Sequence, residues 1–217
     1  MPEAAPPSIE FDMLPAALRP LAARGRTVRY RKGALLIQEG ELRDEQFIVL
    51  TGRVRAYSTD ERDREIVYGT YGPGEYLGEM SLDGGPRSAS VVALEPTSCV
   101  MLTRQSLREH IAAEPDFAFE LIGKVIHRAR MATRSARSMA LLDVYGRVAQ
   151  LLDDAARPLP DGTRRIDQRL THQEIAAHVG CSREMVSRLM KDLEAGDYIG
   201  VDAQRRIHVR RPLPHRW

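Results

Sequence analysis

The hydrophobic pattern of this chain changes its period close to Pro115, and that change constrains the fold more than any other feature of the sequence. From Thr27 to about Thr103, short runs of β-forming residues alternate with glycine-containing turns. The runs cover residues 27–30, 34–37, 47–50, 54–57, 66–68, 90–93 and 99–102. Many short strands with regular glycine punctuation predict an antiparallel β-barrel or a jelly roll.

After Pro115 the pattern is helical and stays so to about Ala156. Apolar residues recur there at spacings of 3, 4, 3, 4 and 3, at Ile122, Val125, Ala129, Ala132, Ala136 and Met139. Such a helix can pack on its own barrel or against the same helix of a second chain. A narrow seam sustained over several turns favours the second arrangement, so we predict a homodimer.

The C-terminal part is predicted to form two short helices and a β-hairpin. Thr171 and Glu174 have the spacing of a capping box at the start of the first helix. Gly180 ends that helix and permits positive φ in the turn, and Ser182 caps the second helix. This order, with hairpin strands near residues 198–201 and 206–209, predicts a helix-turn-helix followed by a wing.

The polar face of the second helix carries residues that suit base edges in a DNA major groove. Arg183 and Arg188 can each donate paired hydrogen bonds to a guanine, and Glu184 can accept one from a cytosine. A solvated, charged helix face is the alternative, but the turn, the cap and the side chains together favour DNA. The other predicted DNA contacts are Thr171, His172, Ser182, Ser187 and Arg205, with Arg206 beside the last of them.

Two segments of the sequence resemble a known family of transcription regulators. Residues 141–150, and residues 170–188 with the string Cys-Ser-Arg-Glu-Met-Val-Ser-Arg, closely resemble the CRP/FNR family, and in particular its cAMP receptor branch. The resemblance extends over about residues 25–211 and implies an α+β protein. It implies a cyclic-nucleotide-binding β-barrel (jelly roll) at 9–113, a dimerisation helix and hinge at 114–142, and a winged helix-turn-helix at 143–217. Residues 1–8, which are rich in Pro and Ala, are predicted to form a disordered tail.

The predicted barrel carries a second motif of that resemblance. Residues 76–80 followed by residues 86–89 resemble the phosphate-binding cassette of cyclic-nucleotide domains. The Arg87 guanidinium would pair with a cyclic phosphate, and the N–H groups of Ser88 and Ala89 would add an anion-binding nest. Glu79 would accept a hydrogen bond from a ribose 2′-hydroxyl. The full predicted ligand site is Gly78, Glu79, Met80, Arg87, Ser88, Ala89, Arg128, Ala132 and Thr133.

Two departures from the family pattern bear on the identity of the effector. Glu79 and Arg87 are eight positions apart, which shortens the cassette. On the long helix, Ala132-Thr133 replaces the Thr-Ser pair that cAMP receptors present to the adenine. We expect cAMP as the effector, with cyclic di-GMP or a ligand-independent member of the family as alternatives.

Several other functions lack the residues that they require. Only two cysteines, Cys99 and Cys181, are present, so the sequence predicts no disulfide framework, no iron–sulfur cluster, no metal site and no tightly bound cofactor. Phosphate-binding-loop and nucleophile-elbow motifs are absent, so no catalytic residues and no enzyme are predicted. Without a signal peptide or a membrane-spanning run, the chain is expected in the cytoplasm with no membrane partner.

Together these features predict an allosteric regulator. An effector bound between the barrel and the long helix would bias the helix seam and rotate the winged domains about a hinge near residues 141–143. The predicted partners are a palindromic operator in double-stranded DNA and a second copy of the chain, with RNA polymerase as a further candidate. A regulator that binds only a partner protein is the rival class, and the arginines of the second helix argue against it.

Overall fold

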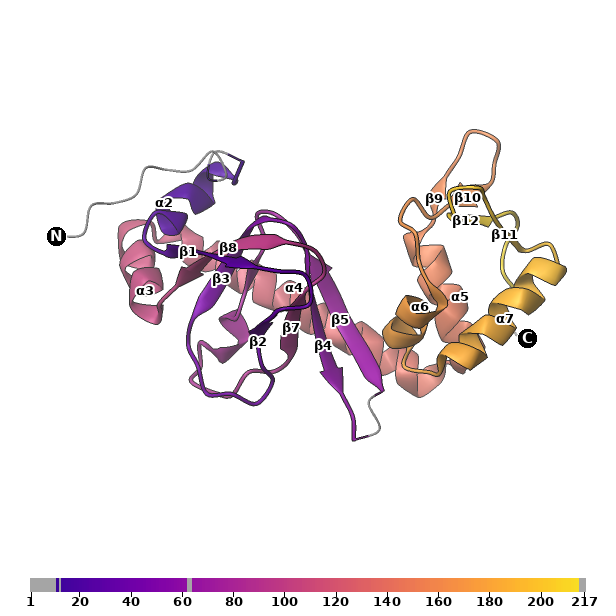
Figure 1. The fold of residues 1–217 in the computed structure, drawn as a ribbon, viewed down its shortest axis with the longest axis horizontal. Coiled ribbons are helices and arrows are strands. Elements are labelled where there is room, and N and C mark those ends of the chain that lie inside the picture. Colours follow the sequence, from indigo (N-terminus) through magenta and orange to yellow (C-terminus); the bar gives the residue numbers. More distant parts are fainter. Residues whose placement is uncertain (1–10, 12, 62–63, 215–217) are drawn as a thin grey trace. The chain divides into compact units, whose positions relative to one another are not determined.

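The computed structural model describes Phe11, residues 13–61 and residues 64–214. The predicted tail at residues 1–8 lies outside the described residues. The chain divides into two units, one of Met1–Ser58 with Val67–Arg130 and one of Thr59–Ile66 with Met131–Trp217 (Figure 1).

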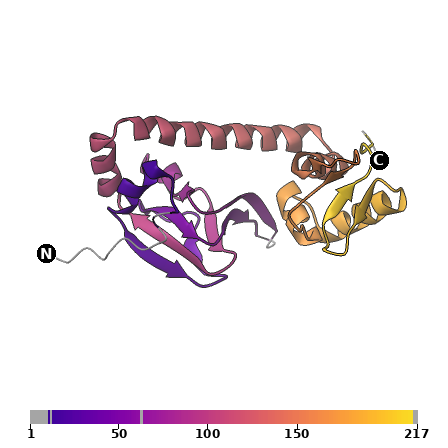
Figure 2. The ribbon, with the colours of Figure 1, turned by 90° about the horizontal axis from the view of Figure 1, so that it is seen from above.

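The first unit contains two four-stranded sheets, with strand orders β1-β8-β3-β6 and β2-β7-β4-β5. Figure 2 shows the ribbon of these strands from a second direction. The strands are β1 Arg26–Tyr30, β2 Leu35–Ile37, β3 Gln46–Thr51, β4 Val54–Thr59, β5 Glu65–Tyr71, β6 Tyr76–Leu77, β7 Ser90–Ala93 and β8 Thr97–Leu102. Of the two predicted arrangements, the structure therefore has the jelly roll. All seven predicted runs are strands, and β6 is an addition.

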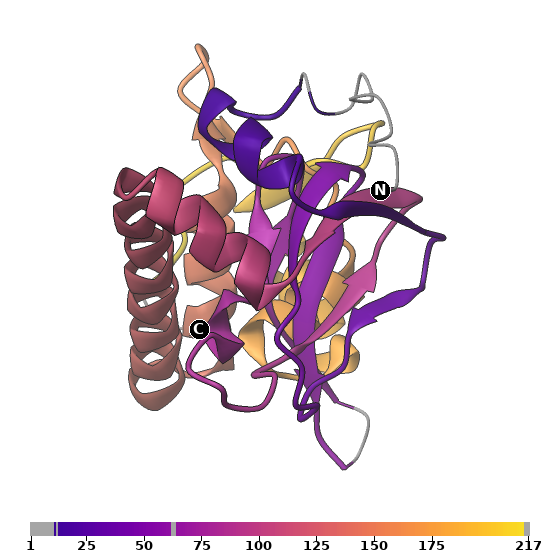
Figure 3. The ribbon, with the colours of Figure 1, turned by 90° about the vertical axis from the view of Figure 1, so that its left-hand side faces the viewer.

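The central strand β3 is buried on both faces and so joins two hydrophobic layers. Phe47 and Val49 face the second sheet, in one cluster with Cys99. Ile48 and Leu50 face the other way, into a cluster with residues of the short helices η1 Ala16–Leu18 and α2 Arg19–Ala22, of α3 Arg104–Ala113 and of the first turn of α4. Figure 3 shows α3 next to the strands.

The predicted helical stretch to Ala156 is two helices, α4 Asp116–Leu141 and α5 Val144–Ala155. The break lies at Asp143, whose carboxylate accepts a hydrogen bond from the Gly146 backbone at 2.7 Å and so caps α5. Helix α3, which lies between β8 and α4, had not been predicted from the sequence. None of the helices among the described residues combines the length and the apolar character that crossing a membrane requires.

The second unit packs helices α5, α6 His172–Val179 and α7 Arg183–Ala195 with an antiparallel sheet of order β11-β12-β10-β9. Its strands are β9 Arg157–Pro158, β10 Arg164–Arg165, β11 Ile199–Val201 and β12 Ile207–Val209. The fully buried side chains of its core include Leu152, Ile166, Ile175, Met190 and Leu193. The predicted helix-turn-helix and wing are present, and the short β9–β10 pair adds two strands to the predicted hairpin.

His110 on α3 is a buried polar residue with no hydrogen-bond partner. Its side chain is 1% exposed, and neither ring nitrogen has a partner among the described residues. The ring packs edge-on against Phe117, with 4.8 Å between ring centroids. Burial, with the positive charge of Arg24 as a second cause, lowers the pKa of His110 below its usual 6.5, while Glu114 and Glu120 act in the opposite direction. The folded protein therefore holds a neutral imidazole.

This burial predicts a pH dependence of stability. Below pH 6.5 the unfolded chain takes up a proton at His110 before the folded protein does, so the free energy of unfolding should fall as the pH decreases through that window. His110→Phe should remove this component and stabilise the fold by about 1–3 kcal/mol, because two unsatisfied polar atoms disappear. Urea unfolding from pH 5 to 8 measures both effects. His178→Gln, an exposed histidine, is the control, and equal pH slopes for wild type and His110→Phe would contradict the prediction.

Candidate functional site

Gly78 marks the turn that begins the candidate cassette. It follows β6, has φ of +91°, and precedes the short 3-10 helix η2 Glu79–Ser81. A Cβ atom there would lie 2.7 Å from the Glu45 carbonyl oxygen and 2.8 Å from Arg87 Nη1. Only glycine fits this position, both in conformation and in space.

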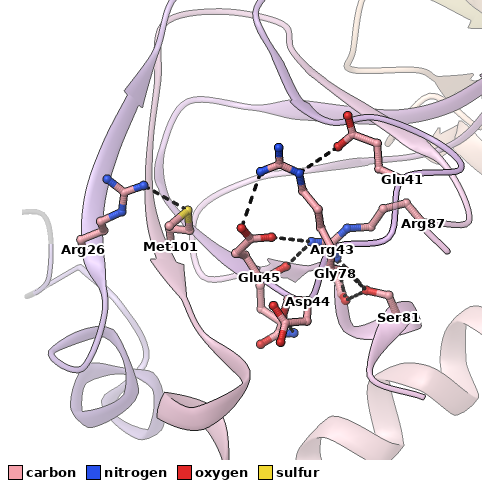
Figure 4. A network of polar contacts seen from close by, with 10 residues as sticks. Arg26, Glu41, Arg43, Asp44, Glu45, Gly78, Ser81, Arg87 and Met101 are labelled. Atoms are coloured by element: carbon pink, nitrogen blue, oxygen red, sulfur yellow. Dashed lines mark hydrogen bonds and ion pairs between the residues drawn. The ribbon is translucent and has the colours of Figure 1, made fainter. Parts of the chain in front are cut away.

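Arg87 is the buried centre of the cassette, with a side chain that is 4% exposed. Its Nη1 donates to the Gly78 carbonyl at 3.1 Å and to Ser81 Oγ at 2.8 Å. Its Nη2 donates to the Glu45 carbonyl at 2.6 Å and lies 3.5 Å from Glu45 Oε2 (Figure 4). Burial lowers the pKa of Arg87, and the neighbouring Glu45 carboxylate counters that effect. A guanidinium stays charged even so.

Glu79, the second predicted ligand residue, is 3% exposed. Its Oε1 forms an ion pair with Arg128 of α4. Arg128 also donates to the Tyr76 carbonyl at 2.7 Å and lies over the Tyr71 ring at 4.8 Å from its centroid. The other oxygen of Glu79, Oε2, is buried without a hydrogen-bond partner among the described residues. Such an acceptor is favourable only if a donor reaches it.

The remaining predicted ligand residues differ in their placement. The backbone N–H groups of Ser88 and Ala89 make no hydrogen bond within the described chain and are open to an anion. Met80 is 47% exposed. Ala132 and Thr133 are exposed residues of α4, and their place in a ligand site stays a prediction.

Sequence reasoning missed three residues of the cassette. They are Glu45, which pairs with Arg87, Ser81, which accepts from it, and Tyr71, which covers Arg128. Glu45 and Arg87 are separated by 42 residues, and no local pattern connects them. Ser81 is the nearest of the three to the recognised motif, because it directly follows residues 76–80.

The predicted caps of the helix-turn-helix are present. Thr171 Oγ1 accepts from the Glu174 backbone at 3.2 Å, and Glu174 Oε2 accepts from the Thr171 backbone at 2.7 Å. Gly180 has φ of +69° at the end of α6, and Ser182 Oγ accepts from the Met185 backbone at 3.2 Å. The hydroxyls of Thr171 and Ser182, which had been assigned to DNA contact, therefore also serve the helix termini.

Helix α7 presents its predicted base-reading residues to solvent. Arg183, Glu184 and Arg188 are exposed, and the two arginines have no hydrogen bond or ion pair among the described residues. The Glu184 backbone N–H, with the Ser182 side chain as a further donor, lowers the pKa of Glu184, so this residue is a carboxylate. Ser187 Oγ lies 2.8 Å from His172 Nδ1, which joins two residues that had been predicted separately.

The start of α6, helix α7 and the wing together line a hollow of about 350 Å³. Four of the residues predicted to contact DNA meet there, namely Thr171, His172, Arg183 and Arg205. The hollow is also lined by Arg169 and Gln173, which sequence reasoning missed although Gln173 lies within the capping-box segment and Arg169 lies two residues before it. A concave surface with three arginines suits an anionic ligand such as a DNA phosphate.

The arginines of the wing fall into two groups. Asp202 accepts from the Arg206 backbone at 2.8 Å, from Arg206 Nε at 2.8 Å and from His208 Nε2 at 3.1 Å, and these bonds lower the pKa of Asp202. Arg210 pairs with Asp197. Arg205, with φ of +60°, is exposed and has no side-chain partner among the described residues. In and beside the wing, Arg205 is therefore open to solvent, whereas Arg206 and Arg210 form ion pairs within the protein.

The sequence matches two described families. Residues 27–114 match the cyclic nucleotide-binding domain, which includes the whole Gly78–Arg87 cassette. Residues 146–212 match the Crp-like helix-turn-helix domain, which includes the caps, α7 and the wing. Within the described residues, no group of three or more His, Cys, Asp or Glu side chains is arranged to hold a metal ion.

Characterised relatives extend these matches along the chain. A CRP-like cAMP-activated global transcriptional regulator of Mycobacterium tuberculosis is 31% identical over 194 residues, which cover 88% of this chain and 87% of the relative. The cAMP-activated global transcriptional regulator CRP of Salmonella typhimurium is 32% identical over 171 residues, which cover 76% and 81%. The solved structure of the c-di-GMP responsive regulator CLP of Xanthomonas campestris has a TM-score of 0.76 at 24% identity, with 90% and 98% covered.

The contacts at Gly78 predict the effect of a single added methyl group. Gly78→Ala combines an unfavourable φ of +91° with contacts below 3 Å to Glu45 and Arg87. Gly84 has the same φ of +91° but nothing within 4 Å, so Gly84→Ala isolates the backbone effect of about 1–2 kcal/mol. We expect Gly78→Ala to lose about 2 kcal/mol more than Gly84→Ala in denaturant unfolding. Equal losses would mean that the cassette tolerates a side chain.

Proposed function

The chain belongs to the CRP/FNR family of transcription regulators, and we propose that it binds a palindromic operator as a homodimer under the control of a cyclic nucleotide. The observation that carries the proposal is the set of unpaired arginines on and beside α7. Arg183, Arg188 and Arg205 extend into solvent from a rigidly capped helix-turn-helix and its wing. Unpaired, positioned guanidinium groups are the groups that read guanines and bind phosphates.

Within this proposal the two kinds of contact come from different places. Arg183, Glu184 and Arg188 lie in the first two turns of α7 and read base edges in the major groove. Arg169, His172 and Arg205 line the hollow beside them and bind the DNA backbone. A two-fold dimer then prefers half-sites about 10–10.5 bp apart, and the family resemblance implies a GTGA-like half-site.

This division predicts two different responses to arginine removal. Arg183→Ala should weaken binding to a cognate palindrome by about 1–3 kcal/mol and barely affect a scrambled duplex, because a base contact is lost. Arg205→Ala should weaken both equally and lower the salt dependence, because a phosphate contact is lost. Fluorescence anisotropy over a salt series measures both affinities.

Arg210→Ala is the matched control, because this exposed arginine already pairs with Asp197. It should leave both affinities nearly unchanged. If Arg183→Ala and Arg205→Ala lowered cognate and scrambled binding alike, the division into base readers and phosphate contacts would be wrong.

The proposed effector is cAMP. The buried, unpartnered Oε2 of Glu79 suits a ribose hydroxyl donor, and the N–H groups of Ser88 and Ala89 suit the cyclic phosphate. Both curated relatives reported above are more than 30% identical to this chain and are described as cAMP-activated, which supports the same choice. Cyclic di-GMP is the alternative, because the cassette is short and Ala132 offers no hydroxyl to an adenine. Calorimetric titration with both nucleotides decides between them.

We further propose that effector binding is coupled to DNA binding through α4 and the segment at 141–143. A coupling of about 1–3 kcal/mol is enough for such control. The proposed site of action is the cytoplasm, with RNA polymerase as a further partner through which operator binding affects transcription.

The proposed dimer rests on an apolar stripe along α4. Phe119, Ile122 and Ile126 follow one another at spacings of 3 and 4 and are 74%, 52% and 44% exposed. Phe119 extends the predicted seam by one turn toward the start of the helix, Ile122 is the first member of that seam, and Ile126 directly follows its second member, Val125. Large apolar side chains at such spacing favour association with an identical helix.

Ile122→Glu should therefore shift the protein from dimer to monomer, because it places two like charges against each other at the seam. Sedimentation velocity at micromolar concentration measures this shift. His127→Glu is the control, since it adds the same charge at an exposed position away from the stripe. A dimer that persists in Ile122→Glu would contradict the assignment of the interface.

A further inference from the structure

We propose that the Glu45 carboxylate occupies the anion position at Arg87 in the unliganded protein, so that an anionic effector must displace it. The inference rests on the proposed effector function and concerns the regulation of the same site. Glu45 would then set the affinity of the cassette by competing with the incoming phosphate for one guanidinium.

The distances from Arg87 to its acceptors indicate which acceptor an effector can displace. Three acceptors are neutral, the Gly78 carbonyl, the Glu45 carbonyl and Ser81 Oγ, and each lies within 3.1 Å of a guanidinium nitrogen. Two of them are backbone atoms whose positions the strands and the η2 turn determine. The fourth partner is the charged Glu45 carboxylate, whose Oε2 lies 3.5 Å from Nη2. It is carried on a flexible side chain and is held less closely than the other three.

Exposure distinguishes the two members of this ion pair. The Arg87 side chain is 4% exposed, whereas that of Glu45 is 26% exposed. A phosphate that approaches from solvent therefore meets the Glu45 carboxylate before it reaches the guanidinium. If both anions stayed, two like charges would compete for one buried cation, which is unfavourable where water screens poorly.

A second arginine, Arg43, lies close enough to stabilise the displaced Glu45 carboxylate. Arg43 Nη1 lies 3.7 Å from Glu45 Oε1, and Arg43 Nε lies 3.2 Å from Glu41 Oε2. The Arg43 side chain is 62% exposed, so it can follow Glu45 outward at little steric cost. Effector binding then changes two ion pairs. The phosphate replaces the Glu45 carboxylate at Arg87, and Glu45 keeps its ion pair with Arg43.

Asp44 offers a matched control for this chain of charges. It is the adjacent residue of the same loop, it is exposed, and its carboxylate forms no ion pair with Arg87, although its charge acts on that group through space. Asp44→Asn therefore removes the same charge from the loop without removing the direct competitor. A general electrostatic effect of the loop would appear in both Asp44→Asn and Glu45→Gln, whereas displacement would appear only in Glu45→Gln.

The experiment is calorimetric titration of the full chain with cAMP and with cyclic di-GMP. Glu45→Gln should bind the nucleotide about tenfold more tightly than wild type, which corresponds to about 1.4 kcal/mol, and Asp44→Asn should stay within about twofold. Arg43→Gln should weaken binding in the wild-type background but not in Glu45→Gln, because only a displaced carboxylate needs Arg43. Glu45→Thr repeats the test with a second neutral side chain, and thermal unfolding verifies that each variant is folded.

Each result bears on one proposal in particular. If wild type binds a nucleotide and Glu45→Gln binds it no more tightly, or more weakly, the inference is overturned and the proposed effector function stands. If Glu45→Gln binds while wild type does not, competition by Glu45 is supported in its strongest form. If neither protein nor Glu45→Thr binds either nucleotide, the proposed effector function fails, and this inference fails with it.

Discussion

The buried guanidinium of Arg87 connects three parts of the jelly roll that are distant in sequence. A charge removed from water is stable only if acceptors surround it, and here the acceptors come from the η2 turn and from the end of the loop before β3. The backbone adds two bonds, since Gly40 N–H donates to the Arg87 carbonyl and Arg87 N–H to the Glu41 carbonyl, each at 2.9 Å. The cassette is thus built around its cation before any ligand arrives. The absence of a side chain at Gly78 is a direct consequence of this packing.

In the second unit the important arginines are exposed, whereas Arg87 of the first unit is buried. The chain carries a net charge of only +2, so a basic DNA surface has to arise from the arrangement of charges and not from their number. Acids neutralise the arginines that support the wing, as Asp202 does for Arg206 and Asp197 for Arg210. Within the described part of the chain, Arg183 and Arg188 of α7 have no acidic partner of this kind. A nearly neutral protein can therefore present a locally cationic face.

Local patterns predicted the features that depend on neighbouring residues. The glycine-punctuated strands, the capping box at Thr171 and the positive φ at Gly180 follow from short-range sterics and hydrogen bonding, and the structure contains all three. The two-residue strands β6, β9 and β10 are too short to have a period of their own. The pair of Glu45 with Arg87 and that of Glu79 with Arg128 join residues 42 and 49 positions apart, so they follow from the tertiary fold alone. The motif therefore drew attention to Glu79 and Arg87, but it contained no sign of the protein groups with which their side chains pair.

That occupancy changes how the cassette can be linked to the rest of the chain. The partner of Glu79 is Arg128, a residue of α4, and Arg128 is further held by the Tyr76 carbonyl and the Tyr71 ring. One carboxylate oxygen of Glu79 therefore connects the η2 turn to α4, while the other, Oε2, is buried and unsatisfied. A hydroxyl donor that reaches Oε2 would share the carboxylate with Arg128 and so change the strength of that connection. Because α4 also carries the exposed apolar stripe at Phe119, Ile122 and Ile126, a ligand at Glu79 would act on the same helix that we propose as the dimer interface. The shared Glu79 carboxylate would then be the physical link between the two proposed functions.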